Sequence, residues 1–306
     1  MKNILITGSS GYLGKKLVIY LSKKKSLKIR TLSRKKINDF NNSVKQITYS
    51  DFSNIFNYKK ILDNVETIVH LAAYSNESKK IYNKNDFEKI NIFFLKKFLK
   101  ECNKYNIKKF IFVSSSKVYG EHNINDRVFS INSKTNPQNN YSLSKLIGEK
   151  IVKTYCKLYQ IEFLIIRMPM VYGDKNNKNF RLLENYVKYH LPIPINNFNN
   201  SKSVLHIENF CDFIFKILPK NKFKKNIINI CDNDDLLISE LINFFIKKYK
   251  SKNIKIYFQI NFIKYSLYLI GKKNIYEKLF LNNKISNSSA KFFYNWRPKY
   301  SFKDYI

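Results

Sequence analysis

A tyrosine and a lysine four residues apart are the side chains of this sequence best suited to move a proton. Residues 141–145 read Tyr-Ser-Leu-Ser-Lys, and this spacing on a helix places the first and last side chains on one face. A free tyrosine has a pKa of about 10, so it becomes a base at neutral pH only when a neighbouring cation stabilises the phenolate. In a chain with 22 tyrosines and many lysines, such a pair taken alone more often belongs to an ordinary surface helix, and it gains weight only with other motifs.

The start of the chain has the pattern of a phosphate-binding turn. Residues 3–7 are apolar and predict a strand, and GSSGYLG at 8–14 predicts a turn into a helix that runs to about residue 23. Glycines let the backbone approach a pyrophosphate, and the helix N-terminus attracts the anion. The cofactor-binding residues expected here are Gly8, Gly11, Tyr12, Leu13 and Gly14.

The end of the next predicted strand, 27–32, bears on the choice of cofactor. An acidic residue there would bind the ribose 2′-hydroxyl of NAD, whereas Ser33 and Arg34 offer a hydroxyl and a cation that suit the 2′-phosphate of NADP. Arg34 is also compatible with an exposed basic side chain that contacts no ligand. The sequence therefore does not decide between NAD and NADP as the cofactor.

Apolar segments alternate with helical patterns through the first half of the chain. Further strands are predicted near residues 46–49, 67–70, 110–114 and 163–167, with helices at 86–105 and 140–159. This alternation predicts an α/β fold with a doubly wound parallel sheet. Ligands of such sheets bind beyond the carboxyl ends of the strands, where Gly8, Ala72, Ser115 and Tyr141 fall.

Four motifs, in this order and spacing, resemble the extended short-chain dehydrogenase/reductase family and its nucleotide-sugar epimerase and dehydratase branch. They are GSSGYLG (8–14), HLAA (70–73), SSSKVYG (114–120) and YSLSK (141–145). The resemblance covers essentially the whole chain. It implies a Rossmann-type NAD(P)-binding domain, residues 1–170 with 204–232 returning to it, and a smaller substrate-binding lobe formed by 171–203 and 233–306.

The resemblance also implies roles for individual residues. Tyr141 would be the acid/base, Lys145 would bind the nicotinamide ribose and lower the tyrosine pKa, and Ser115 would bond the reacting oxygen. The other residues implied at the cofactor are Asp51 (at the adenine), Phe52, Leu71, Ala72, Ala73, Asn91 and Pro169, and those at the substrate are Ser116, Asn179 and Lys202. Lys202 stands where the family usually has Arg, so the charge is kept but bidentate phosphate contact is lost.

The reaction implied is hydride transfer at C4 of a nucleotide sugar, with UDP the expected nucleotide. The 4,6-dehydratases of this branch have an Asp-Glu pair after the catalytic Thr, but Ser116 and Lys117 stand there, so an elimination is not expected. The reaction expected is 4-epimerisation, and an NADPH-dependent 4-keto-sugar reductase is the alternative that Arg34 favours. A non-catalytic Rossmann protein that senses the cofactor is a third alternative, against which Ser115, Tyr141 and Lys145 count.

Composition limits the partners. The net charge is +34, but only six of the 56 basic residues are Arg, and abundant Lys, Asn and Ile are what AT-rich codons encode. We therefore expect a solvated basic surface and no specific nucleic-acid site, with peripheral contact to an anionic membrane left open. No metal site is expected. The family resemblance implies a homodimer through the helices at 86–105 and 140–159.

Four widely spaced cysteines, Cys102, Cys156, Cys211 and Cys231, predict free thiols in a reducing cytoplasm. No signal peptide is evident, and no apolar run reaches the roughly 20 residues of a membrane span.

Overall fold

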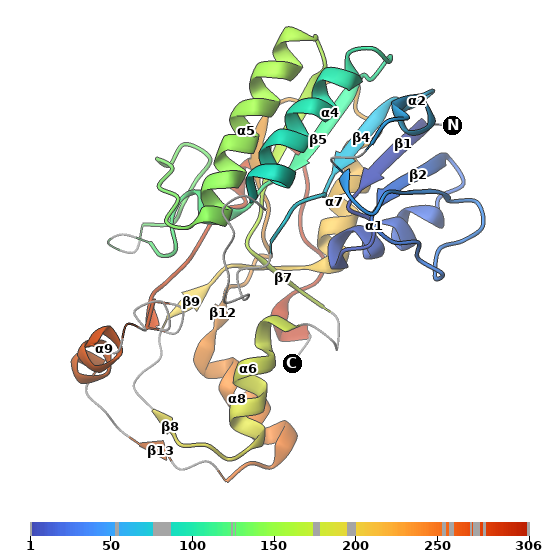
Figure 1. The fold of residues 1–306 in the computed structure, drawn as a ribbon. Coiled ribbons are helices and arrows are strands. Elements are labelled where there is room, and N and C mark those ends of the chain that lie inside the picture. Colours follow the sequence, from blue (N-terminus) through green and yellow to red (C-terminus); the bar gives the residue numbers. More distant parts are fainter. Residues whose placement is uncertain are drawn as a thin grey trace.

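The computed structural model describes residues 2–52, 55–75, 87–123, 125, 127–173, 178–194, 200–252, 255–256, 260–269, 271, 276–277 and 280–304. Its centre is a seven-stranded parallel sheet (Figure 1) with the spatial order β3-β2-β1-β4-β5-β6-β11. The strands are β1 (Lys2–Thr7), β2 (Leu27–Ser33), β3 (Lys45–Thr48), β4 (Thr67–His70), β5 (Lys109–Val113), β6 (Glu162–Arg167) and β11 (Ile227–Asn229). This arrangement confirms the predicted doubly wound Rossmann sheet.

Helices cover both faces of the sheet, because its central strands are apolar on both sides. Ile4 and Ile6 of β1 belong to the core on one face, and Leu5 belongs to the core on the other face. The helical elements of this part are α1 (Tyr12–Ser22), α2 (Tyr58–Leu62), the π-helix η2 (Glu88–Phe94), α4 (Leu95–Cys102), the 3₁₀ turn η3 (Ser116–Val118), α5 (Asn140–Leu158), α7 (Ile207–Ile217) and α11 (Ser288–Tyr294).

Below the sheet in Figure 1, later segments form a smaller layer with a core of its own, which contains Tyr172, Val204, Leu241, Phe245 and Phe302. Short strand pairs join these segments: β10 with β7, β12 with β9, and β13 with β8. The elements are β7 (Met170–Tyr172), α6 (Lys178–Lys188), β8 (Ile193–Pro194), β9 (Ser201–Lys202), β10 (Val204–His206), β12 (Leu236–Leu237), α8 (Ile238–Tyr249), β13 (Lys255–Ile256), α9 (Ile260–Leu269) and the 3₁₀ turn η5 (Phe302–Asp304).

The chain returns to the main sheet after this layer begins, since β11 pairs with β6. The division into a cofactor domain and a substrate lobe remains a prediction, with the boundaries given above.

The helix predicted at 86–105 differs from expectation, because residues 88–94 form a π-helix before α4 begins. The widened turn contains Asn91, whose buried amide makes contacts described below. Such π segments often lie at functional sites.

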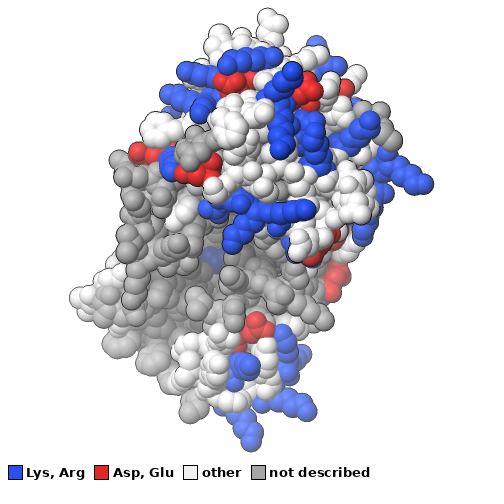
Figure 2. Space-filling view, turned by 45° about the vertical axis from the view of Figure 1, so that its right-hand side comes forward, with Lys and Arg blue, Asp and Glu red and all other residues white. Residues whose placement is uncertain are grey.

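Lys and Arg side chains are spread over the upper and lower parts of the face in Figure 2 and are not gathered in a single patch.

Each helix within the described ranges is too short or too polar to cross a bilayer. All four cysteines are buried free thiols.

Candidate active site

The turn between β1 and α1 is closed by packing at two glycines and open at the third. A Cβ on Gly8, where φ is +72°, would lie 2.6 Å from the amide nitrogen of Ala72, and a Cβ on Gly14 would lie 2.4 Å from the Gly8 carbonyl oxygen. A Cβ on Gly11 would meet only the Gly8 carbonyl, at 3.3 Å, and Gly11 is exposed. Gly11 is also the N-cap of α1, and because glycine has no side chain, the first turn of this helix has no side-chain cap from that position. This open backbone at a helix N-terminus fits the pyrophosphate of NAD or NADP.

Gly8 lies beside the end of β2, because its N–H donates to the Leu32 carbonyl at 2.8 Å. Ser33 is buried, and its Oγ donates to the Lys35 carbonyl at 2.7 Å. Arg34 is exposed, and no carboxylate among the described residues pairs with it. The Arg34 guanidinium therefore keeps its charge available at this strand end.

Two predicted cofactor residues lie after β3, namely Asp51, expected at the adenine, and Phe52. Asp51 forms an ion pair of 2.6 Å with Lys89, so part of its acceptor capacity is already used. Phe52 is buried, and its ring stacks on Phe94 of η2 with 4.8 Å between centroids. Phe52 thus supports the sheet and η2 rather than standing open to a ligand.

The segment after β4 is held against the glycine turn. The Ala72 N–H donates to Thr7 Oγ1 at 3.2 Å, and Leu71 and Ala73 on either side of it are half-buried. Asn91 connects this segment to α5: its side chain bonds the backbone N–H and carbonyl of Tyr74 and donates to Ser144 Oγ at 2.8 Å.

Lys145 lies at the carboxyl end of β5, as the motif requires. Its side chain is buried, its Nζ donates to the Val113 carbonyl at 2.8 Å, and the ammonium lies 5.0 Å from the centroid of the Phe112 ring. Burial lowers the pKa of Lys145 to about 8, and the Glu149 carboxylate opposes this shift. The lysine is thus a cation at neutral pH that loses its charge more readily than an exposed lysine.

Ser115 and Ser116 follow β5 at the same end of the sheet. Ser115 caps η3, accepting a bond from the Lys117 N–H at 3.2 Å, and the Ser116 N–H donates to the Met168 carbonyl at 2.8 Å. Met168 precedes the buried Pro169, so the structure brings the ends of β5 and β6 together. The Lys117 ammonium lies 3.5 Å from Glu121, and no carboxylate occupies the two positions after Ser115.

Tyr141 is the second residue of α5, and the cap that begins this helix was not predicted. Asn139 and Ser142 form a reciprocal capping box, and Asn139 Nδ2 donates to Glu121 Oε1. The cap fixes the first turn of α5 relative to the loop that follows Ser115. An Asn followed three residues later by Ser was the available sequence signal.

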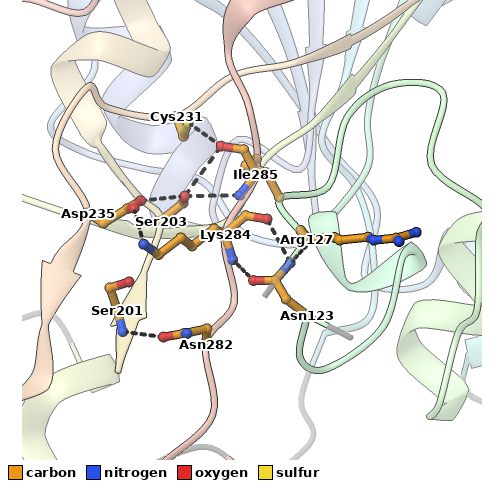
Figure 3. Close-up of polar contacts among 9 residues, drawn as sticks. All are labelled: Asn123, Arg127, Ser201, Ser203, Cys231, Asp235, Asn282, Lys284 and Ile285. Atoms are coloured by element: carbon orange, nitrogen blue, oxygen red, sulfur yellow. Dashed lines mark hydrogen bonds and ion pairs between the residues drawn. The ribbon is translucent and has the colours of Figure 1, made fainter. Parts of the chain in front are cut away.

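Residues 282–286, far along the chain, complete the wall beside this loop (Figure 3). Asn123 Oδ1 accepts from the Lys284 N–H at 2.6 Å, and Asn123 Nδ2 donates to the carbonyls of Arg127 and Lys284. On the other side, Ser203 Oγ donates to Asp235 Oδ1 at 2.7 Å and accepts from the Ile285 N–H at 3.0 Å.

Figure 3 also shows further bonds of this wall. They are Ser201 N–H to Asn282 Oδ1, Cys231 Sγ to the Ile285 carbonyl, Ser203 Oγ to the same carbonyl at 3.4 Å, and the ion pair of Lys284 with Asp235. Nothing in the sequence pattern indicated this arrangement.

Lys202 and Asn179 are the other residues predicted at the substrate. Lys202 pairs with Asn283 beside the same wall, and its ammonium donates to the Leu281 carbonyl at 2.9 Å. Asn179 lies in α6, but its side chain is outside the described residues.

The family described as "NAD dependent epimerase/dehydratase family" matches residues 4–231 of this chain. The chain belongs to that family. This epimerase/dehydratase family is NAD dependent, in agreement with the open turn at Gly11. The family confirms the resemblance seen in the motifs, whereas the roles of individual site residues remain predictions.

Relatives and solved structures agree with this assignment. A UDP-glucose 4-epimerase of Vibrio cholerae is 25% identical over 306 residues, 99% of this chain and 93% of that protein. A dTDP-D-glucose 4,6-dehydratase of Dictyostelium discoideum is 30% identical over 226 residues, 67% of this chain but only 50% of that protein. A UDP-glucuronic acid 4-epimerase structure from Bacillus cereus, solved with NAD, has a TM-score of 0.78 at 21% identity and covers 99% of this chain and 95% of that one. The last likeness establishes the fold.

Proposed function

We propose that this epimerase/dehydratase family member is a 4-epimerase that transfers a hydride at C4 of a nucleotide sugar, with UDP the expected nucleotide. The observation that carries the proposal is the placement of Lys145: its buried ammonium is bonded to the end of β5, one helical turn from Tyr141 and next to the Ser115 segment. The full-length likeness to the Vibrio cholerae UDP-glucose 4-epimerase supports this choice of reaction.

The proposed chemistry assigns each residue one task. The cofactor would supply a nicotinamide as the hydride acceptor. Gly11 and the Ala72 segment would hold the cofactor at its pyrophosphate, and Lys145 would hold the nicotinamide ribose. Tyr141 takes the proton of the C4 hydroxyl, Ser115 bonds the same oxygen, and the Lys145 ammonium stabilises the Tyr141 phenolate. Once the 4-keto sugar has turned its other face, C4 takes the hydride back from the nicotinamide on that side while Tyr141 gives its proton back to the oxygen, so C4 is inverted.

An elimination fits the residues less well. Ser116 is buried with its N–H bonded to Met168, and the neighbouring Lys117 is a cation paired with Glu121. No acid and base lie directly after Ser115 to remove water from a sugar. We therefore favour epimerisation over 4,6-dehydration.

The second candidate is an NADPH-dependent 4-keto-sugar reductase, and the exposed Arg34 at the end of β2 favours it. Cofactor released from the denatured protein separates the two candidates. An epimerase regenerates its cofactor in each cycle and should hold NAD tightly, whereas a reductase must exchange it and should be isolated largely empty. Turnover is then assayed by NMR with UDP-hexoses, their N-acetyl forms and 4-keto derivatives. Absence of turnover on the whole panel would favour a non-catalytic cofactor sensor instead.

We also propose a homodimer through the outer face of α4 and α5. A shallow hollow there is lined by apolar and basic side chains, namely Lys96, Lys100, Ile147, Lys150, Ile151, Thr154, Tyr155, Leu158 and Tyr159. Leu158 is 68% exposed and lies among the other apolar side chains of this hollow, so a second copy would cover a continuous apolar surface there. The free buried thiols support a reducing compartment such as the cytoplasm. No specific nucleic-acid partner is proposed.

A further inference from the structure

Behind the site lies a buried ion pair that the proposed chemistry does not use. Glu149 is fully buried in α5, one helical turn after Lys145. Its Oε1 accepts from Ser114 Oγ at 2.7 Å and from Arg167 Nε at 2.8 Å, and its Oε2 accepts from an Arg167 Nη at 2.6 Å. The Arg167 guanidinium thus binds both carboxylate oxygens of Glu149, so each of the two buried charges has a partner of opposite sign. A buried ion pair seldom stabilises a fold more than apolar residues would, so stability alone is a weak reason for its presence.

The partners of Glu149 belong to the segments that form the site. Ser114 directly precedes Ser115, and Arg167 directly precedes Met168, whose carbonyl bonds the Ser116 N–H. The Arg167 guanidinium also lies 4.7 Å from the centroid of the Tyr119 ring. The carboxylate therefore joins α5, the end of β5 and the end of β6 at one point.

The titratable and charged groups on the elements around Lys145 lie on α5, β6 and β4. On α5 they are Tyr141 and Glu149, and on β6 the cation Arg167 is paired with Glu149. On β4, burial and the nearby Lys145 lower the pKa of His70 to about 3, so His70 is neutral at physiological pH. On β5 the contacts are the Val113 carbonyl and the Phe112 ring. Among these groups, Glu149 is the anion whose field reaches the ammonium.

We propose that Glu149 is a positioning residue for the hydride-transfer site: held by Arg167 and Ser114, its carboxylate fixes Lys145 relative to the Ser115 segment and offsets the cost of burying the ammonium. The inference rests on the proposed function. Glu149 does not contact the substrate; it acts through Lys145.

The test compares Glu149→Gln with a double variant, Glu149→Gln/Arg167→Met, which removes both charges and leaves no unpaired cation. Without the carboxylate, the pH above which kcat falls should decrease by about one unit in both variants, which is a tenfold change in the protonation equilibrium of Lys145. KM should change little. Glu101→Gln is the matched control, because it removes a carboxylate from the surface pair with Lys104 and should leave the pH profile unchanged.

If the ion pair only supports the fold, the double variant will regain both stability and the wild-type pH profile, and the proposal is overturned. The pH dependence of NAD affinity, measured by calorimetry, gives a second readout that needs no turnover. A downward shift in the variants supports the role of Glu149 even if no sugar is turned over, in which case only the proposed function fails. An unshifted affinity profile overturns the inference.

Discussion

The Nζ atom of Lys145 lies 2.8 Å from the carbonyl oxygen of Val113. This bond fixes a flexible side chain to the end of a central strand, so the ammonium is in place before any ligand binds. Because Ser115 is two residues from Val113, the same strand positions both groups. Pre-organisation of this kind avoids reordering the site during each turnover.

Tyr141→Phe should reduce kcat about 10²- to 10⁴-fold, which is the usual contribution of a positioned acid/base. The ring remains, so substrate affinity measured by calorimetry should stay close to wild type. Ser115→Ala should cost less, since its hydroxyl bonds the oxygen without taking the proton. Tyr155→Phe, farther along α5, is the control. A Tyr141→Phe protein with wild-type turnover would remove Tyr141 from the catalytic role.

The rate should fall as the pH rises above about 8, because burial lowers the pKa of Lys145 to about 8 and the ammonium is lost there. Below that pH the cation is present and stabilises the Tyr141 phenolate. Lys145→Met lacks the cation at every pH, so its tyrosine pKa rises and its residual activity should move to higher pH. A pH profile of kcat for the two proteins checks this; superimposable profiles would contradict it.

Arg34→Asp should weaken NADP(H) binding about tenfold or more and NAD(H) binding far less, because it places a carboxylate where a 2′-phosphate would bind. Fluorescence titration with the two cofactors measures the difference. Lys28→Asp makes the same charge change at the opposite end of β2 and should have little effect on either. Equal titration curves for the two cofactors in the wild type and in the variant would remove Arg34 from the site.

Gly11→Ala and Gly14→Ala should separate cofactor binding from folding. At Gly11 the new methyl meets only one atom, at 3.3 Å, so Tm should stay near wild type while NAD affinity falls. At Gly14 it would lie 2.4 Å from the Gly8 carbonyl oxygen, and the overpacking should cost about 1–3 kcal/mol of stability. Calorimetry with thermal unfolding checks both; unchanged NAD affinity in Gly11→Ala would contradict a pyrophosphate at that turn.

Leu158→Lys should raise the dimer dissociation constant at least about tenfold, since burial of a leucine contributes about 1.5–3 kcal/mol. Lys96, Lys100 and Lys150 line the same hollow, so salt should strengthen the wild-type dimer by screening their repulsion. Sedimentation velocity at low and high salt measures both effects. Leu269→Lys, on α9, is the matched control because Leu269 is 88% exposed. A wild-type monomer at every salt concentration would exclude this interface.

The sequence predicted those parts of the molecule that depend on local pattern. Alternating apolar segments and the glycine turn predicted the parallel sheet, and the YSLSK spacing placed Tyr141 and Lys145 on α5. The π-helix around Asn91 was missed because its apolar spacing resembles that of an ordinary amphipathic helix. The Glu149–Arg167 pair and the bonds of Asn123 to Lys284 were also missed. Both sets of bonds join residues from different elements, so no hydrophobic pattern within one element could have predicted them. Asn123 and Lys284 are 161 positions apart.

The bonds between residues 282–286 and the loop that contains Asn123 have a consequence for biosynthesis. That loop must wait for a partner made 161 residues later, which at 5–20 residues per second is about 8–32 s of translation. A ribosome-bound chain that ends before residue 282 can already pair β1 to β6, while the loop ahead of Tyr141 still lacks its neighbours. The wall beside the candidate active site is thus among the last parts of the protein to form, and until then the loop ahead of Tyr141 lacks the bonds that hold it.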